Sequence, residues 1–375
     1  MKVLMIFVDM LRAVNQNVCN ESAPRNRLDD ALSKVGGIVY SRCYSSSPDT
    51  PRGLASIWTG TLPRVNGCDK RTKYPRYFLN ENLDTIWKLF KRKHLSLNLF
   101  VSKDSLEIGV LPEEILSDAN IYDDSNLNRF LDSVQIKDNS VTFLELHDYH
   151  AIVDDTEYKL SGLDFIYETV GGEIDLIFDK FGRDNFDIVI IFSDHGCLQE
   201  GDEHIMSHRG RIQTYLQLWI KNAEIDELNR DDRLCSCMDI FPTMAFLLND
   251  FVLNRIDGLN LLTNAQHSFL VIEDYMDVKV SLSQTPEWWG IIFPDFNVQT
   301  DCWGNWYSDG KRIQLNSEQE ETFSTILKNY VGSYEENVKG HRTIAKYAEM
   351  SERLHNQPAF YDNGEKRIPA PNSFA

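Results

Sequence analysis

The sequence has few basic residues for its number of acidic ones, and it has no long apolar run. Its 38 lysines and arginines are outnumbered by 57 aspartates and glutamates, which gives a net charge of −19 at pH 7. Because no basic stripe offsets this charge, we exclude nucleic acid as a partner. No apolar stretch approaches the ~18 residues that a membrane-spanning helix needs, so we expect no membrane span.

Cysteines are also few, and no signal peptide is recognisable. The 7 cysteines are odd in number and scattered, and the spacing in Cys235-Ser236-Cys237 is too short for an ordinary structural disulfide or zinc knuckle. The first apolar run starts at Lys2 and stops at Asp9, whereas a signal peptide needs a longer apolar region and a small-residue cleavage site. If Met1 is the native start, these features predict a cytoplasmic protein.

What the sequence does contain is an alternation of β-rich apolar runs with helix-like segments. The strand-like runs cover residues 3–8, 38–43, 95–101, 141–145, 187–192 and 215–220. The helix-like runs cover residues 29–35, 53–59, 83–91 and 162–181. This alternation predicts an α/β fold with a mostly parallel central sheet flanked by helices.

The pattern changes near residue 263, where an aromatic-rich segment follows. Tryptophans there lie close to alternating strand patterns, namely Trp288, Trp289, Trp303 and Trp306. We therefore expect a core over residues 1–262 and a smaller C-terminal α+β subdomain with an irregular tail over residues 263–375. The 375 residues are enough for two such units, since domains typically have about 100–200 residues.

Residues 49–60, Asp-Thr-Pro-Arg-Gly-Leu-Ala-Ser-Ile-Trp-Thr-Gly, place a hydroxyl where a helix is expected to begin. We expect Thr50 at the N-cap and Pro51 at the first helical position, ahead of an apolar helix face. The positive end of the helix dipole favours an anion or an alkoxide at this place. Thr50 is either a nucleophile or a plain helix cap, and the flanking motifs decide between these two interpretations.

Two buried strand-like runs end in acidic residues. The first run ends at Asp9, and the run over residues 187–192 leads into Asp194 and His195. Ligands gather at the carboxyl ends of strands in an open α/β sheet, and carboxylate and imidazole groups suit a divalent metal. We therefore predict a site for zinc, manganese or calcium, with one ion or two, since these ligands serve all three metals.

Histidines cluster in the middle of the chain. His147 and His150 follow the strand-like run over residues 141–145, and His204 and His208 lie in a polar loop. Each is either an ordinary loop histidine or part of a site, and the sequence leaves the roles of His147, His204 and the neighbouring Asp148 open.

These blocks, in this order, resemble the sulfatase-like branch of the alkaline phosphatase superfamily. The resemblance covers roughly the first 315 residues, in blocks at residues 8–12, 50–67, 145–150, 193–196, 238–261 and 306–311. Each block is weak alone, whereas six blocks in the family's order are specific. The resemblance implies an alkaline-phosphatase-like fold whose catalytic core is the unit over residues 1–262.

The residue at the nucleophile position separates the branches of this family. Sulfatases place there a cysteine or serine that matures to formylglycine, which Thr50 cannot become. Met10 replaces the second of the sulfatases' opening aspartates, and Leu54 replaces their arginine four residues after the nucleophile, with Arg52 nearby. Thr50 and His195 instead look like the phosphoester-handling branches, which include phosphodiesterases, phosphoethanolamine transferases and lipoteichoic acid synthases.

The resemblance thus implies a metal-dependent hydrolase of phosphate mono- or diesters with Thr50 as covalent nucleophile. Asp9, Asp194 and His195 would hold the metal together with Thr50. A bound divalent metal lowers the pKa of water from about 15.7 to about 7, and the same effect on the Thr50 hydroxyl would give an attacking alkoxide.

Other residues are expected to handle the substrate, a small anionic ester that is either free or linked to a glycan. Arg52 and Arg12 are candidates for binding its oxygens. His150 and His208 are candidates for binding the substrate, protonating the leaving group or holding a second metal. The alternatives are a cytosolic transferase that moves a phosphoryl-linked head group onto a glycan, a sulfate-ester hydrolase, and a pseudoenzyme. The oligomeric state is not predicted.

Overall fold

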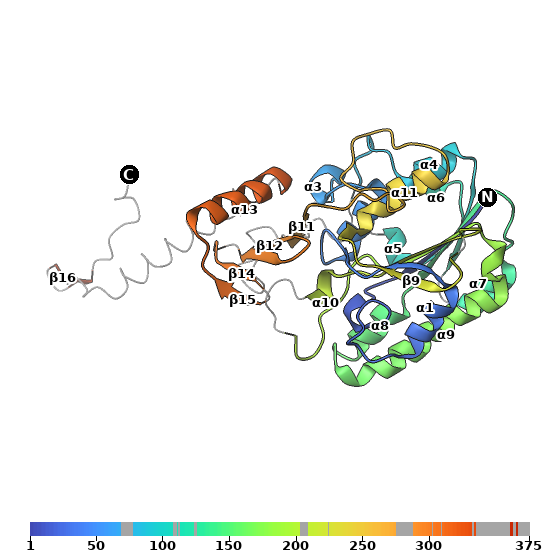
Figure 1. Ribbon diagram of the computed structural model, residues 1–375, viewed down its shortest axis with the longest axis horizontal. Helices are drawn as coiled ribbons and strands as arrows, with labels where there is room; N and C mark the ends of the chain where they lie inside the picture. The colour runs from blue at the N-terminus through green and yellow to red at the C-terminus, as the bar shows by residue number, and fades with distance from the viewer. Residues whose placement is uncertain are drawn as a thin grey trace.

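An eight-stranded sheet forms the centre of the molecule (Figure 1). The computed structural model describes residues 1–68, 78–107, 111, 113–123, 126–202, 209–223, 225–274, 288–301, 303–308, 310–331, 334, 361–362 and 365–366. The strand order is β5-β4-β6-β1-β7-β8-β2-β9, and only β8 runs antiparallel to its neighbours. The strands are β1 (Lys2–Val8), β2 (Gly37–Tyr40), β4 (Ser96–Val101), β5 (Asn120–Asp123), β6 (Ser140–Leu146), β7 (Ile188–Phe192), β8 (Leu216–Ile220) and β9 (Leu228–Asp231).

Helices cover both faces of this sheet because its central strands are apolar on both faces. Successive residues of β1 point to opposite faces, so Phe7 joins one buried cluster with Trp58 of α2, while Ile6 joins another with Ile174 of α9. Figure 1 shows α4 and α11 on one side and α1, α8 and α9 on the other. The main helices are α1 (Arg27–Val35), α2 (Thr50–Thr59), α4 (Ile86–Arg92), α7 (Leu127–Ser133), α8 (Asp148–Asp155), α9 (Leu163–Phe181) and α11 (Ile240–Leu247).

Short elements connect these layers. The short α-helices are α3 (Pro63–Asn66), α5 (Lys103–Glu107), α6 (Glu113–Leu116) and α10 (Arg209–Ile212). The 3-10 turns are η1 (Ala13–Asn15), η3 (Leu160–Gly162), η4 (Arg183–Asn185) and η5 (Cys237–Asp239). Two small sheets pair β3 (Cys43–Tyr44) with β10 (Cys235–Ser236), and β16 (Tyr361–Asp362) with β17 (Glu365–Lys366).

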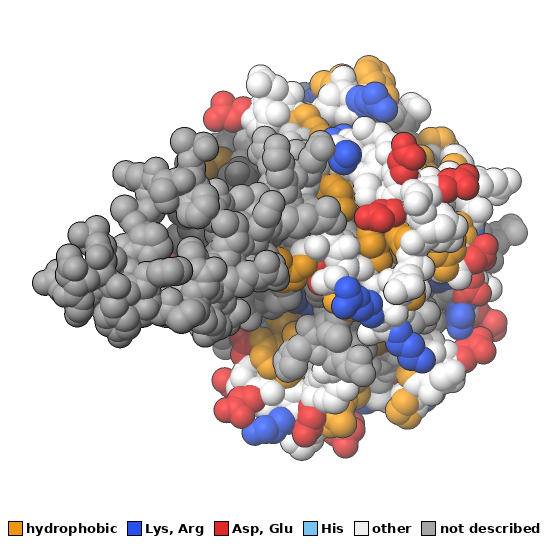
Figure 2. Space-filling view, turned by 90° about the vertical axis from the view of Figure 1, so that its left-hand side faces the viewer, with side chains coloured by type: hydrophobic (Ala, Val, Ile, Leu, Met, Phe, Trp, Pro, Cys, Tyr) orange, Lys and Arg blue, Asp and Glu red, His pale blue; other side chains and the backbone are white. Residues whose placement is uncertain are grey.

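A separate antiparallel sheet of five strands follows the core. It contains β11 (Leu270–Asp274), β12 (Trp288–Ile292), β13 (Asn297–Asp301), β14 (Trp306–Ser308) and β15 (Lys311–Ile313), and α13 (Ser317–Tyr330) packs on it. In Figure 1 this orange and red unit lies beside the core. Seen from that side, the described surface carries acidic and basic side chains scattered singly, without a basic stripe (Figure 2).

The predicted fold class is confirmed, and so are the positions of the predicted strands and helices. The run predicted over residues 38–43 divides into β2 and the start of β3, and the short strands β5 and β9 were not predicted. The domain boundary at residue 263 stays a prediction, and the end of the tail lies outside the described residues. Among the described helices, none is both long and apolar enough to cross a bilayer.

Candidate active site

Two neighbouring strands deliver predicted metal ligands to one edge of the sheet, and a third strand delivers His147 to the same edge. Asp9 follows β1, His147 follows β6, and Asp194 and His195 follow β7. Because β6, β1 and β7 are adjacent and parallel, their carboxyl ends meet at the same edge. The structure thus brings Asp9, Asp194 and His195 close together.

Helix α2 brings the Thr50 hydroxyl to the same edge, although not as predicted. The helix begins at Thr50, and the N-cap is Asp49, whose side chain accepts a hydrogen bond from the Arg52 backbone N–H. The prediction of Thr50 as N-cap is thus wrong by one residue. Since Asp49 caps the helix, the Thr50 hydroxyl does not cap it. This hydroxyl instead contacts the carboxylate of Asp9 and the imidazole of His195 at the strand ends.

Four side chains converge around this hydroxyl, and we call Asp9, Thr50, Asp194 and His195 the ligand set. The Thr50 Oγ1 donates a hydrogen bond to Asp9 Oδ1 over 3.2 Å and lies 3.2 Å from His195 Nε2. His195 Nε2 in turn lies 3.4 Å from Asp194 Oδ2. Asp9, Asp194 and His195 are buried and offer one ligand atom each within 4.8 Å of one another, a spacing that suits a metal ion.

Asp194 has a buried carboxylate oxygen that a bound cation would satisfy. Its Oδ1 accepts the His195 backbone N–H over 2.8 Å, whereas its Oδ2 has no hydrogen-bond partner. Burial, assisted by the charge of Asp9, raises the pKa of Asp194 to about 6. A divalent cation between these carboxylates would stabilise their ionised forms and satisfy the unpaired oxygen, so the residues present fit a metal.

His195 has the tautomer that a metal ligand needs. Its Nδ1 lies 2.5 Å from the Gly196 carbonyl oxygen, and only a protonated nitrogen can donate to that acceptor. The neutral ring therefore carries its proton on Nδ1 and presents the lone pair of Nε2 to Thr50 and Asp194.

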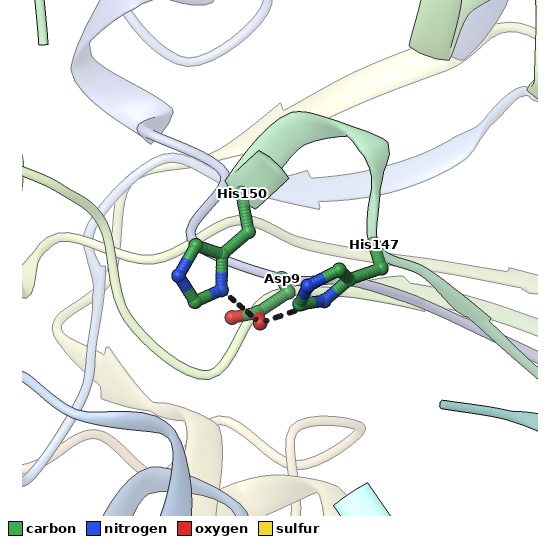
Figure 3. A group of neighbouring side chains, drawn as sticks. All are labelled: Asp9, His147 and His150. Carbon is green, nitrogen blue, oxygen red and sulfur yellow. Dashed lines mark hydrogen bonds and ion pairs between the residues drawn. The ribbon is translucent and has the colours of Figure 1, made fainter. Parts of the chain in front are cut away.

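The other oxygen of Asp9 faces two histidines, which we call the histidine pair, His147 and His150 (Figure 3). His150 Nδ1 donates to Asp9 Oδ2 over 2.7 Å, and His147 Nδ1 lies 3.5 Å from the same oxygen. The two side chains keep 28% and 34% of their surface exposed, so they border solvent. Together with Asp9 they also satisfy metal-ligand spacing, so this side of Asp9 suits a second ion or an anionic substrate.

His150 is held between two carboxylates. Its Nε2 lies 3.2 Å from Asp154 Oδ2, one helical turn further along α8. Burial lowers the pKa of His150, but the hydrogen bond to Asp9 and the charges of Asp9 and Asp154 outweigh it and raise that pKa to about 9. Burial raises the pKa of Asp9, but its contacts with His147 and His150 and the charge of His195 outweigh this effect and hold that pKa well below its usual range. A cationic imidazole is suited to bind an anion or to protonate a leaving group.

The two predicted substrate arginines are buried in ion pairs. Arg52 has no exposed surface, and its Nε donates to Asp49 Oδ2 over 2.6 Å. Arg12 is 5% exposed and binds Asp202 through both Nη atoms as well as the Cys197 carbonyl. A guanidinium without exposed surface cannot meet a substrate unless the site rearranges, so the structure does not place Arg52 where we expected it.

The structure brings together Thr50, Asp9, Asp194, His195 and His150. The remaining predicted residue, His208, lies outside the described residues, as does His204. Sequence reasoning missed Asp154, for which the four-residue spacing from His150 on a helix was an available signal.

Sequence reasoning also missed Gly53. A Cβ atom added there would lie 2.9 Å from the Asp194 carbonyl oxygen and 3.1 Å from the Asp194 Cβ. The absence of a side chain at residue 53 therefore lets α2 pack directly on Asp194, with Thr50 one turn away. A glycine in the first turn of the helix was the available signal.

Comparisons with known proteins identify the fold. No family model and no curated protein matches the sequence. A putative sulfatase from Bacteroides thetaiotaomicron is 14% identical with a TM-score of 0.68, over 90% of this chain and 94% of that one. Phosphonate monoester hydrolase of Agrobacterium radiobacter is 13% identical with a TM-score of 0.57, over 98% and 100% of the two chains.

A third solved structure has its substrate, D-glucosamine-2-N,6-O-disulfate, bound. It is 12% identical with a TM-score of 0.60, over 95% of this chain and 98% of that chain. The chain thus has the same fold as these solved structures, an alkaline-phosphatase-like fold. At these identities the likeness concerns the fold, and the activity has to be argued from the site.

Proposed function

We propose that this protein is a metal-dependent hydrolase of phosphate esters that uses Thr50 as its covalent nucleophile. The observation that carries this proposal is the position of the Thr50 Oγ1, 3.2 Å from Asp9 Oδ1 and 3.2 Å from His195 Nε2. A threonine hydroxyl is a poor nucleophile at neutral pH unless its environment favours the alkoxide. A divalent cation held by the ligand set would supply that environment by lowering the pKa of the hydroxyl.

In the starting state of the proposed reaction, Thr50 Oγ1 would already have lost its proton to solvent. In the first half, this oxygen forms a bond to phosphorus and the bond from phosphorus to the alcohol oxygen breaks. His150, held by Asp9 and Asp154, gives a proton to the departing alcohol. In the second half, water attacks the phosphothreonine, the bond from Oγ1 to phosphorus breaks, and the phosphate leaves. His150 takes up a proton from that water, which restores the starting state.

The residue at position 50 supports a phosphate ester over a sulfate ester. Thr50 cannot form the aldehyde hydrate that sulfatases use, whereas a phosphothreonine can be cleaved at phosphorus by water at a metal site. The sulfate-ester reaction is the second candidate, because the sugar disulfate in a structural neighbour matches the expected anionic, glycan-linked substrate.

A panel of four aryl esters, offered to metal-replete protein, tests the proposal. The esters are a phosphate monoester, a phosphate diester, a phosphonate monoester and a sulfate, each with the same aryl leaving group. We expect one of the phosphorus esters to be the best substrate and activity to disappear with a chelator. A preference for the sulfate would contradict the proposal. Transfer of the phosphoryl group to an added glycan alcohol, in place of release to water, would select the transferase.

A further inference from the structure

A completely buried arginine lies in the first turn of the nucleophile helix. Arg52 has no exposed surface, and its Nε and Nη2 both donate to Asp49 Oδ2. Asp49 Oδ1 accepts the Arg52 backbone N–H over 3.3 Å. Asp49 and Arg52, which flank Thr50 in the sequence, are therefore bonded to each other. Their contact fixes the backbone that carries the Thr50 hydroxyl.

The same guanidinium reaches the C-terminal sheet. Arg52 Nη1 donates to the Glu273 carbonyl oxygen over 3.3 Å, near the end of β11. The Glu273 backbone N–H donates to the Ser46 carbonyl over 2.9 Å. Ser46 lies four residues before Thr50, and we call residues 46–53 the nucleophile turn. One residue of β11 is thus bonded through its backbone to the chain on both sides of Thr50.

Apolar contacts hold β11 in this position. Ile272 and Leu270 of β11 share a buried cluster with Tyr44 of β3 and Ile212 of α10. Because Tyr44 lies only two residues before Ser46, this cluster fixes the start of the segment that leads to Thr50. The C-terminal sheet is therefore packed against the part of the core that carries the nucleophile.

We propose that Arg52 is a positioning residue through which the C-terminal sheet fixes Thr50. A guanidinium offers five N–H donors on three nitrogens in a rigid plane, so it can hold Asp49 and the Glu273 carbonyl in a fixed geometry, whereas a lysine has its three donors on a single nitrogen at the end of a flexible stem. The inference rests on the proposed function only where Thr50 is named as nucleophile. The coupling between the two parts of the chain is a separate, measurable property.

Arg52→Met and Arg52→Lys test the proposal, with Arg64→Met as the matched control. Arg64 of α3 is exposed and lies over the Tyr330 ring of α13 at 5.7 Å, so it also contacts the C-terminal unit, and it lies outside residues 46–53. We would measure amide hydrogen exchange over residues 46–53 and 270–273, and then kcat and KM on the best ester of the panel.

Arg52→Met should speed exchange in both segments together and lower kcat about 100-fold, because a shift of about 1 Å in a reacting group has that effect. KM should change little, Arg52→Lys should restore only part of kcat, and Arg64→Met should alter neither segment. If Arg52→Met fails to fold, Arg52→Lys carries the same test, since it keeps the charge.

Two results would overturn the inference. Unchanged exchange in residues 270–273 would show that Arg52 does not couple the sheet to the turn. A large rise in KM with kcat and exchange unchanged would make Arg52 a substrate ligand. If no ester is hydrolysed by the wild-type protein, the proposed function fails, and the exchange measurement still decides whether the coupling exists.

Discussion

The two oxygens of Asp9 face environments of different kinds. On the Oδ1 side lie Thr50 and the buried His195, close to the unpaired oxygen of Asp194. On the Oδ2 side lie His147 and His150, which border solvent. One carboxylate thus divides a closed region that suits a tightly held cation from an open region that suits an exchanging anion.

The difference in burial also sets the charges of the two regions. Burial raises the pKa of Asp194, so the closed region gains from a cation that keeps this carboxylate ionised. In the open region, the carboxylates of Asp9 and Asp154 raise the pKa of His150, so its imidazole is cationic at neutral pH. A cation inside and a proton donor at the entrance are the two groups that cleavage of a phosphate ester needs.

The largest expected effect comes from replacing Thr50, the proposed nucleophile. Thr50→Ala removes the attacking oxygen and should lower kcat by a factor on the order of 10⁴ to 10⁶, as the loss of other covalent nucleophiles does. Thr50→Ser keeps the hydroxyl and is the matched control, so it should lose much less. The measurement is single-turnover hydrolysis with metal-loaded protein, and near-full activity of Thr50→Ala would place the nucleophile elsewhere.

The next prediction compares the two sides of Asp9 directly. Asp194→Asn should weaken metal affinity well beyond the ~10–100-fold loss typical of a residue that only orients a ligand, because it removes a ligating charge. His150→Asn should leave the tightest site nearly unchanged and lower kcat about 10²–10⁴-fold, as expected for a lost general acid.

Titration calorimetry with elemental analysis would check both variants against the wild type. If His150→Asn removes one of two bound ions, the histidine pair is a metal site and not a substrate site. If Asp194→Asn binds metal as tightly as the wild type does, the closed region is not the metal site.

A smaller effect is expected from the packing of α2 on the closed region. A Cβ atom at Gly53 would lie 2.9 Å from the Asp194 carbonyl oxygen, so Gly53→Ala should push the helix and Thr50 away from Asp9, Asp194 and His195. We expect kcat to fall about 10–100-fold, since a displacement below 1 Å already matters for reacting groups.

Gly172→Ala is the matched control, because nothing lies within 4 Å of a Cβ atom added at Gly172 in α9. There the substitution should stabilise the protein by up to about 1 kcal/mol through helix propensity and leave kcat unchanged. Equal kinetics of the two variants would show that the contact between α2 and Asp194 does not position the nucleophile.

The closed region was largely predictable from the sequence because it depends on buried strands. β1 and β7 are continuous apolar runs, so their ends could be located, and parallel neighbours bring such ends together. The short polar strand β9, by contrast, carries no apolar signal, since its residues read Leu-Asn-Arg-Asp.

The direction of side chains in the first turn of α2 was not predictable. Asp49 and Thr50 are both good helix caps, and in the structure Asp49 caps the helix while its side chain also pairs with Arg52. Arg52 lies in the interior, where it also contacts the Glu273 carbonyl of β11, although residue type alone favours solvent or substrate. Local propensity cannot predict this position because Glu273 lies far away in the sequence.

The smallest expected effect concerns the stability of the metal-free protein against pH. The pKa of His150 is raised from 6.5 to about 9 in the folded protein, so the folded state binds this proton more tightly than the unfolded chain does. The resulting stabilisation is complete below pH 6.5 and is lost as the pH rises through about 9. Over this window the free energy of unfolding should fall by at most about 1.4 kcal/mol per pH unit.

The stabilisation from the raised pKa of Asp194 is also lost as the pH rises, but between pH 3.8 and about 6. The contributions of Asp194 and His150 to the free energy of unfolding can therefore be measured separately. Urea unfolding of chelator-treated protein at several pH values from 6.5 upward would measure the slope, and His150→Asn should reduce it. A variant with the wild-type slope would show that Asp9 and Asp154 do not hold a proton on His150. The open region would then lack its cationic group, and the contrast between the two sides of Asp9 would rest on burial alone.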